Sequence, residues 1–426
     1  MNKRFFPFAQ WWPEFKRPGV VRADVFAGLT GAVVVLPQGI AYAMLAGMPP
    51  HYGLYAAMVP CLIAALFGSS RLMMTGPANA ISLTTMALIA PLALPGSNEY
   101  VALVLTLTLL VGILQIVLAL VKAGKWVDLI PHSVILGFTF GAAILIMNSQ
   151  VGQLLGIGLA KNLSVYKTWM TAAESIWQQQ WHPENLTIIL LTLLMIRGWR
   201  RFNRYIPAML VSIVVASVVV FISERYWPDF LGINYVEPVP SAFPPFSLPS
   251  LSLESLRSLF GPALIMVLLA STEAMSIGRA LALKSKDRFD ANQEFLGQGL
   301  ANLSGAFFSS YPVSGSFNRS GVNLAAGAQT PLSGVMATVF LILILLFIAP
   351  LAEYLPYLVI SASLLAVAWK LIDFKQMRHE FHSGPREWVP MVITAIATLT
   401  IALEWAILLG IFVALFIQRF YPRSKP

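Results

Sequence analysis

Two charged residues lie in stretches of the chain that are otherwise apolar. Glu273 is the acidic residue placed well inside a long apolar stretch, and Arg319 interrupts another. An ionisable residue inside a membrane span is a functional-site hypothesis by default. The arginine supplies a permanent positive charge and a planar fork of donors that suits an oxyanion, and the carboxyl group can take up and release a proton. The pair predicts an anion site with Glu273 as the proton-coupling residue; the alternative is a static Glu273–Arg319 ion pair.

Two segments, 73–90 and 312–328, break their apolar character with Gly, Pro, Asn and, in the second, Arg319. Residues 74–79 (MTGPAN) align with residues 313–318 (VSGSFN). Irregular backbone at membrane depth is tolerated only where it lines a cavity or is packed within protein. If two short helices begin here and face each other, their N-termini form an anion site. Neutral donors at that site are expected from Asn79, Ser316 and Asn318.

Gln38 and Tyr42 follow Pro37 at a spacing of four residues, so they share one face of a helix that the proline kinks. Both can hydrogen-bond to an anion, although helix packing explains them equally well. The five histidines lie near span ends or in loops. They show no metal-ligand spacing, and no nucleophilic triad is evident, so we expect neither an enzyme nor a cofactor.

The elements that position these residues must be membrane helices. Hydrophobic residues make up 57% of the 426-residue chain and charged residues only 11%, against about 25% charged in an average soluble domain. Apolar runs of about 18 residues or more are needed to cross roughly 30 Å of hydrocarbon, and such runs recur along the chain. The net charge of +9 does not indicate nucleic acid, because the basic residues occupy short gaps between runs. The sequence predicts an all-α polytopic membrane protein in a lipid bilayer.

The two interrupted segments join 12 uninterrupted spans to give 14 expected transmembrane segments. The uninterrupted spans cover residues 23–47, 52–69, 100–121, 133–149, 185–196, 206–222, 260–283, 295–308, 331–350, 354–371, 388–403 and 405–418. Cytoplasmic loops of membrane proteins carry an excess of Lys and Arg. With both termini cytoplasmic, the basic residues on the opposite side are only Lys161, Lys167, Arg225 and Arg257. If either interrupted segment is omitted, the loops between the two segments change sides and the basic residues no longer gather on the cytoplasmic side. Both segments should therefore cross or re-enter the membrane.

Each interrupted segment is the third span of a seven-span half. Seven is odd, so the halves must run in opposite directions, and such a 7+7 inverted repeat with broken helices is a transporter architecture. We expect a cytoplasmic amphipathic segment at 1–22 that forms one helix lying at the membrane interface. A first repeat at 23–223, an extracytoplasmic loop at 224–259 and a second repeat at 260–418 should follow. A short cytoplasmic tail should follow at 419–426.

Several motifs occur in one order along the chain. They are LPQGIAYA at 36–43, PHYGLYAA at 50–57, GSSR at 68–71, TGP at 75–77, GQGLAN at 297–302, PVSGSFNRS at 312–320 and TP at 330–331. Together they resemble the sulfate permease (SulP) family, to which solute carrier family 26 belongs. The resemblance implies a uracil-permease-like fold, in which a core of spans 1–4 and 8–11 moves as an elevator against a gate of spans 5–7 and 12–14.

The resemblance also implies an anion held between short half-helices in spans 3 and 10. It matches Glu273 to the acid of proton-coupled members, and position 318 is Asn where many relatives carry Ser, a change that bears on selectivity. Many members continue into a cytoplasmic STAS domain, which we do not expect here, and a homodimer is left open. The residues expected near the anion are Gln38, Tyr42, Gly76, Pro77, Ala78, Asn79, Ser316, Phe317, Asn318 and Arg319.

The leading interpretation is a secondary active anion transporter, with proton-coupled sulfate uptake across a bacterial inner membrane. Dicarboxylate transport and sodium-coupled bicarbonate transport are alternatives with the same fold. Arg319 favours a dianion, and sodium coupling usually needs more ligands than the single acid Glu273. A passive anion channel and a voltage-responsive membrane motor are the alternatives from a different class.

Overall fold

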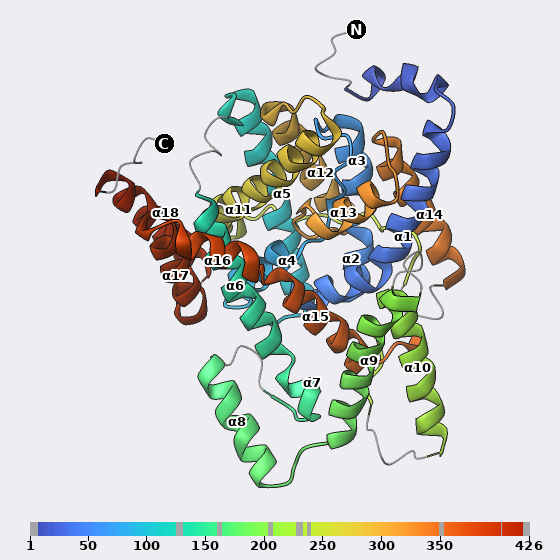
Figure 1. Cartoon of the computed structure of the whole chain (residues 1–426), viewed down its shortest axis with the longest axis vertical. Coiled ribbons are helices and arrows are strands. Elements are labelled where there is room, and N and C mark those ends of the chain that lie inside the picture. Colours follow the sequence, from blue (N-terminus) through green and yellow to red (C-terminus); the bar gives the residue numbers. More distant parts are fainter. Residues whose placement is uncertain are drawn as a thin grey trace. The chain divides into compact units, whose positions relative to one another are not determined.

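The computed structural model describes residues 7–124, 131–159, 164–202, 208–226, 233–236, 240–348, 353–401 and 403–420. Within these ranges the regular structure is helical apart from two very short strands and one isolated bridge (Figure 1). The chain divides into two compact units, and each combines a stretch from the first half of the chain with one from the second half. Unit 1 holds Met1–Val127 and Val236–Glu353, and unit 2 holds Asp128–Tyr235 and Tyr354–Pro426.

Unit 1 contains both interrupted segments. Its elements in chain order are the 3₁₀ helices η1 (Pro7–Gln10) and η2 (Trp12–Lys16), α1 (Val20–Leu45), α2 (His51–Tyr55), α3 (Val59–Phe67), β1 (Thr75–Gly76), α4 (Asn79–Ile89), α5 (Asn98–Leu120), α11 (Leu253–Ser285), α12 (Ala291–Phe307), β2 (Ser314–Gly315), α13 (Phe317–Ala325) and α14 (Leu332–Ile348). Its main helix pairs are α5 with α12, α1 with α14 and α3 with α12. The contact of α5 with α12 is close because Gly112 lies directly against the backbone of Leu303, as is typical of membrane helix interfaces.

Side-chain caps start three long helices of unit 1. Ser97 accepts from the N–H of Tyr100 before α5, and Asp290 accepts from two N–H groups of the first turn of α12. Ser252 caps α11 in the same way. These caps satisfy backbone donors that a helix leaves free at its N-terminus. Because of the cap at Ser252, α11 begins upstream of the apolar stretch expected from residue 260.

Unit 2 packs α6 against α17 and α15 against α9. Its elements are α6 (His132–Ser149), α7 (Val151–Leu155), α8 (Val165–Trp177), α9 (Pro183–Phe202), α10 (Ala208–Tyr226), α15 (Tyr357–Leu371), α16 (Phe374–His382), α17 (Pro385–Thr400) and α18 (Leu403–Phe420). The helices α8 and α16 were not expected from the sequence. They are amphipathic rather than uniformly apolar: α8 buries Thr168 and Ala172 but exposes Trp169 and Trp177. A search for long apolar runs passes over such helices.

The N-terminal segment differs from the prediction of one amphipathic helix over 1–22. Its described part forms the two short helices η1 and η2, and α1 already begins at Val20. The prolines at positions 7, 13 and 18 explain the difference, because proline lacks an N–H donor and disfavours helical backbone in the residue before it. Residues 1–6 of this segment and residues 421–426 of the expected tail lie outside the described residues.

The described helices confirm a polytopic membrane protein in outline. By length and composition, six are able to cross a membrane: Val20–Leu45, Asn98–Leu120, His132–Leu155, Ala208–Tyr226, Leu253–Ser285 and Tyr357–His382. Shorter apolar helices cover His51–Phe67, Asn79–Ile89, Leu332–Phe347 and Trp405–Ile417. The total of 14 passes in two inverted halves stays a prediction.

Candidate functional site

Two short strands bring the interrupted segments together in unit 1. β1 and β2 pair antiparallel, residue 75 opposite residue 315, and the N–H of Ser316 donates to the carbonyl of Met74 at 2.9 Å. The helices α4 and α13 begin within three residues of the ends of these strands. The short half-helices predicted in these segments are therefore present, and both start beside the same strand pair.

Neither of these helix N-termini is capped by a side chain. The residues before the two helices, Ala78 and Ser316, accept no hydrogen bond through their side chains, and neither first turn contains an acidic residue. An α-helix leaves its first four N–H groups without partners inside the helix, and the helix dipole adds a partial positive charge at this end. The two N-termini together provide an environment that suits an anion.

Arg319, in the first turn of α13, is fully buried. Its Nη1 donates to the carbonyl of Thr75 at 3.1 Å, and its Nη2 contacts the sulfur of Cys61 at 3.8 Å. Its Nε is buried without a hydrogen-bond partner. Among the described residues, no carboxylate forms an ion pair with it. A static ion pair with Glu273 is therefore not formed.

Gly76 and Pro77 shape the strand against which this guanidinium lies. A Cβ at position 76 would collide with Nη1 of Arg319, so only glycine allows the approach. Pro77 has no N–H to donate, which ends the strand before α4 begins.

Tyr42 lies among four predicted residues that belong to three other helices, α4, α11 and α13. Its hydroxyl interacts with the side chains of Asn318 and Asn79, and the charges of Glu273 and Arg319 act on it. The helix α1 reaches this position because it packs against both α4 and α13. The structure thus brings together residues that lie up to 277 positions apart in the chain.

Two amide side chains at this place have unsatisfied polar atoms. Gln38, one helical turn before Tyr42, and Asn79, the first residue of α4, are both buried, and their side-chain oxygens lack hydrogen-bond partners. Buried polar groups are nearly always hydrogen-bonded, so such atoms indicate room for a ligand or water. An amide end can present its NH₂ group as well as its oxygen, which lets both side chains donate to an anion.

Glu273 lies on α11, which packs against β2 and α4. One turn earlier on this helix, the carbonyl of Ala270 accepts from the hydroxyl of Ser314 at 2.7 Å, which fastens β2 to α11. The Oε2 atom of Glu273 is buried and has no hydrogen-bond partner. The carboxyl group therefore lies near Tyr42, on whose hydroxyl its charge acts, without being tied to another side chain.

The remaining predicted residues differ in their surroundings. Ala78 and Ser316 are buried beside the two helix N-termini, whereas the side chain of Phe317 is 69% exposed. Phe317 is thus not packed into the group formed by Tyr42 and its neighbours.

The sequence analysis missed two further buried carboxylates in the described part of unit 1, Asp24 and Glu294. Asp24 accepts from the N–H groups of Gln329 and Thr330 and from the Thr330 hydroxyl. Glu294 accepts from two N–H groups of the 69–70 turn and belongs to a polar row on α12. A signal existed for the second: Glu294, Gln298 and Asn302 follow at intervals of four, which places them on one helix face.

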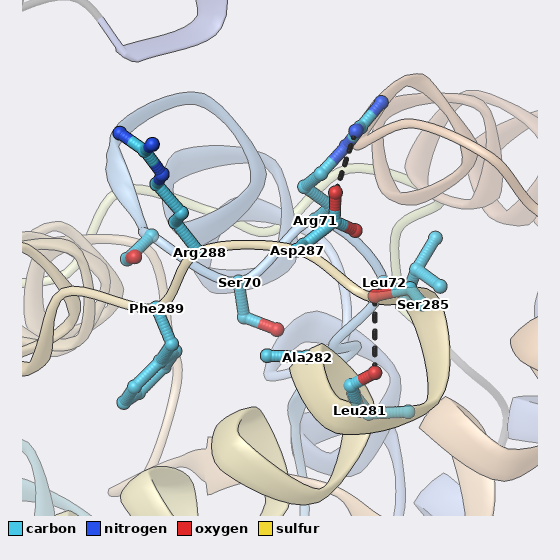
Figure 2. Close-up of a pocket in the computed structure, with 10 residues that line it drawn as sticks. Ser70, Arg71, Leu72, Leu281, Ala282, Ser285, Asp287, Arg288 and Phe289 are labelled. Atoms are coloured by element: carbon cyan, nitrogen blue, oxygen red, sulfur yellow. Dashed lines mark hydrogen bonds and ion pairs between the residues drawn. The ribbon is translucent and has the colours of Figure 1, made fainter.

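Two cavities lie apart from these residues. One, of about 10 Å³ in unit 1, has room for about one water and lies beside Arg71, which donates to Asp287 at 2.9 Å (Figure 2). Burial lowers the pKa of Arg71, but hydrogen bonds to Glu14 and Asp287 outweigh it and raise the pKa above its usual value. The other cavity, about 190 Å³ in unit 2, is lined by apolar residues, glycines and neutral amides such as Asn185 and Asn234. Neither contains a predicted site residue.

Comparison with known proteins identifies the family of the chain. The profile of the sulfate permease family matches residues 21–394. The chain belongs to this family. It is 31% identical to the chloroplastic sulfate transporter 4.1 of Arabidopsis thaliana, over 95% of this chain and 59% of that one. The chain thus spans about three fifths of the length of this relative and of the probable sulfate transporter 4.2 of the same plant.

Solved structures share the fold of this sulfate permease family member. The structure of SLC26A9 superposes with a TM-score of 0.89 at 19% identity, covering 99% of this chain and 69% of that one. The transmembrane domain of a cyanobacterium bicarbonate transporter, BicA, superposes with a TM-score of 0.78 at 23% identity, covering 93% and 98%. These likenesses confirm a multi-pass membrane transporter fold.

Proposed function

We propose that this protein is a secondary active transporter that takes up sulfate together with a proton. The observation that carries the proposal is the buried guanidinium of Arg319, which lies without an ion-pair partner at two uncapped helix N-termini. A site of this kind needs an anion to complete it. Sulfate is favoured because a dianion roughly doubles the attraction that a monoanion experiences from the same charge. The relatives named as sulfate transporters support this choice.

The proton is assigned to Glu273. Its carboxyl group lies near the anion site, has an unsatisfied buried oxygen and forms no ion pair among the described residues. Protonation removes its negative charge when the anion arrives, and ionisation restores that charge when the anion leaves. Arg319 then alternates between the anion and the ionised carboxylate, and this alternation links the two fluxes.

An elevator movement is the proposed route across the membrane. The division into two units supports it, because all the proposed site residues belong to unit 1. A unit that carries the whole site can move as one body without breaking the contacts of the bound anion. We place the protein in a bacterial inner membrane with both termini cytoplasmic, in agreement with the distribution of Lys and Arg.

Reconstituted transport tests the proposal. The purified chain is placed in proteoliposomes, and uptake of radiolabelled sulfate is followed with and without an inward proton gradient. We expect saturable uptake that concentrates sulfate only with the gradient. Oxalate, fumarate, succinate and bicarbonate serve as competitors at two pH values, and sodium replaces the proton gradient in a parallel sample. Non-saturable flux that only equilibrates the label would support a channel instead, and accumulation driven by sodium alone would refute the proton role.

A further inference from the structure

The helix α12 carries a row of three polar side chains along one face. Glu294, Gln298 and Asn302 follow at intervals of four residues, and all three are buried. Burying polar groups costs free energy unless each finds hydrogen-bond partners. Apolar side chains would fill the same space without this cost, so packing alone does not account for the row.

The first two members of the row form a hydrogen-bonded chain that ends at β1. Glu294 accepts from the N–H groups of Ser69 and Ser70 at 2.9 and 2.8 Å. Its other oxygen accepts from Nε2 of Gln298 at 2.8 Å, and the same Nε2 donates to the hydroxyl of Thr75 at 2.8 Å. Glu294 thereby orients the amide of Gln298, which holds Thr75.

The third member holds the segment that leads into β2. Oδ1 of Asn302 accepts from the N–H of Val313 at 2.8 Å, and its Nδ2 donates to the Val313 carbonyl at 3.1 Å. The same Nδ2 lies 2.9 Å from Oε1 of Gln115 on α5. The polar row of α12 is thus bonded both to β1 and to the residue before β2.

Thr75 connects this row to the guanidinium. Its hydroxyl accepts from Gln298, and its carbonyl accepts from Nη1 of Arg319. The other contact of the guanidinium is with the sulfur of Cys61, which is a weak acceptor. The position of Thr75 therefore decides where the charge of Arg319 lies.

We propose that Gln298, oriented by Glu294, is a positioning residue of the anion site: it holds Thr75 and, through the Thr75 carbonyl, places the guanidinium of Arg319. This inference rests on the proposed function, because the guanidinium is placed there to bind sulfate. A binding group must be held within about 0.5 Å of its productive position by residues behind it. The polar row of α12 holds the guanidinium in this way, although none of the predicted anion-site residues lies on α12.

Substitutions at Thr75 test the inference. Thr75→Val keeps the shape but removes the acceptor for Gln298, and Thr75→Ser keeps the hydroxyl. We expect Thr75→Val to raise the KM for sulfate about fivefold, the size expected for one hydrogen bond, with a nearly unchanged maximal rate. Thr75→Ser should restore the wild-type KM. The matched control is Thr108→Val, because the Thr108 hydroxyl is also buried but donates only within its own helix, to Val104 at 2.7 Å; its KM should not change.

A double-mutant cycle separates positioning from general damage. Gln298→Met removes the donor at nearly the same length, so it should raise KM as Thr75→Val does. The two together should raise KM no more than Gln298→Met alone, because the hydrogen bond that Thr75→Val removes is already absent in that variant. Additive effects, or equal changes in the Thr108→Val control, would overturn the inference.

Cys61 offers a readout that does not depend on transport. It is the only cysteine of the chain and is buried against Arg319. A guanidinium released by Thr75→Val loosens this contact, so a small membrane-permeant thiol reagent should label Cys61 several-fold faster than in the wild type or in Thr108→Val. Unchanged labelling with unchanged KM refutes the positioning role. Absence of saturable sulfate uptake in the wild type refutes only the proposed function, and the labelling rates then decide the inference.

Discussion

Replacing Arg319 by methionine tests the anion site most directly. Methionine keeps an unbranched side chain of similar reach but removes the charge and every donor. The guanidinium makes one hydrogen bond of 3.1 Å to the Thr75 carbonyl and one sulfur contact, and no described carboxylate pairs with it. The substitution therefore acts on an anion far more than on the fold.

The size of the effect follows from the charge. A hydrogen bond to a charged group contributes roughly 1.5–3 kcal/mol. Two unit charges about 4 Å apart attract each other by about 4 kcal/mol at an effective dielectric constant of 20, and sulfate carries two charges. The upper end of the hydrogen-bond range, about 3 kcal/mol, lies below the charge–charge attraction and by itself corresponds to roughly 100-fold weaker binding. We expect sulfate uptake at low concentration to fall by at least this factor, with Arg319→Lys intermediate because it keeps the charge but loses the fork.

Stability should change little in the same variant. Loss of the hydrogen bond to the Thr75 carbonyl costs roughly 1.5–3 kcal/mol, and removal of an unpaired buried charge relieves a desolvation cost that opposes this loss. If Arg319 instead belonged to a structural ion pair, its removal would cost about 3–5 kcal/mol.

Uptake in proteoliposomes and thermal unfolding in detergent, measured on the same samples, separate the two cases. Arg257→Met, an exposed arginine of unit 1, is the control for loss of charge. Uptake near the wild-type level, or strong destabilisation that accounts for the loss, would refute the reasoning.

Three further outcomes follow from the geometry. Glu273→Gln should abolish gradient-driven accumulation but preserve exchange of labelled for unlabelled sulfate, because the neutral amide mimics the protonated acid; accumulation that persists would contradict the proton role. Gly76→Ala should impair uptake severely, because the added Cβ displaces the Arg319 guanidinium, and Gly321→Ala, where a Cβ meets open space, should not; equal uptake by the two variants would refute this. Asp24→Asn weakens three hydrogen bonds to residues 329 and 330, so it should lower stability by roughly 1–3 kcal/mol in thermal unfolding while leaving the KM unchanged; a raised KM with unchanged stability would argue against this.

The sequence alone was enough to predict the class of protein and the residues of the candidate site. Long apolar runs are a local property, so the membrane helices follow from composition. Charge is so costly in such runs that Glu273 and Arg319 stood out without any structure. The interruptions by glycine and proline likewise predicted two short helices, and α4 and α13 are present where these interruptions end.

The expectations drawn from local sequence patterns were wrong or incomplete in three places. In the first 20 residues, basic and aromatic residues alternate in a way that suggested one helix. The prolines of this segment interrupt that helix. The amphipathic helices α8 and α16 escaped notice because they contain no long apolar run. Glu294 lies at the beginning of an apolar span, so its burial was not evident from its position in the sequence.

Only the tertiary structure decided how the site is held together. The pairing of β1 with β2, the contact of Arg319 with Thr75 and the row on α12 all join segments that are far apart in the chain. Such contacts depend on which helix faces meet, and many pairings satisfy the same apolar periodicity. Sequence patterns could therefore indicate the candidate residues of the site, but the packing of unit 1 decides that Gln298 bonds to Thr75 and Thr75 to Arg319.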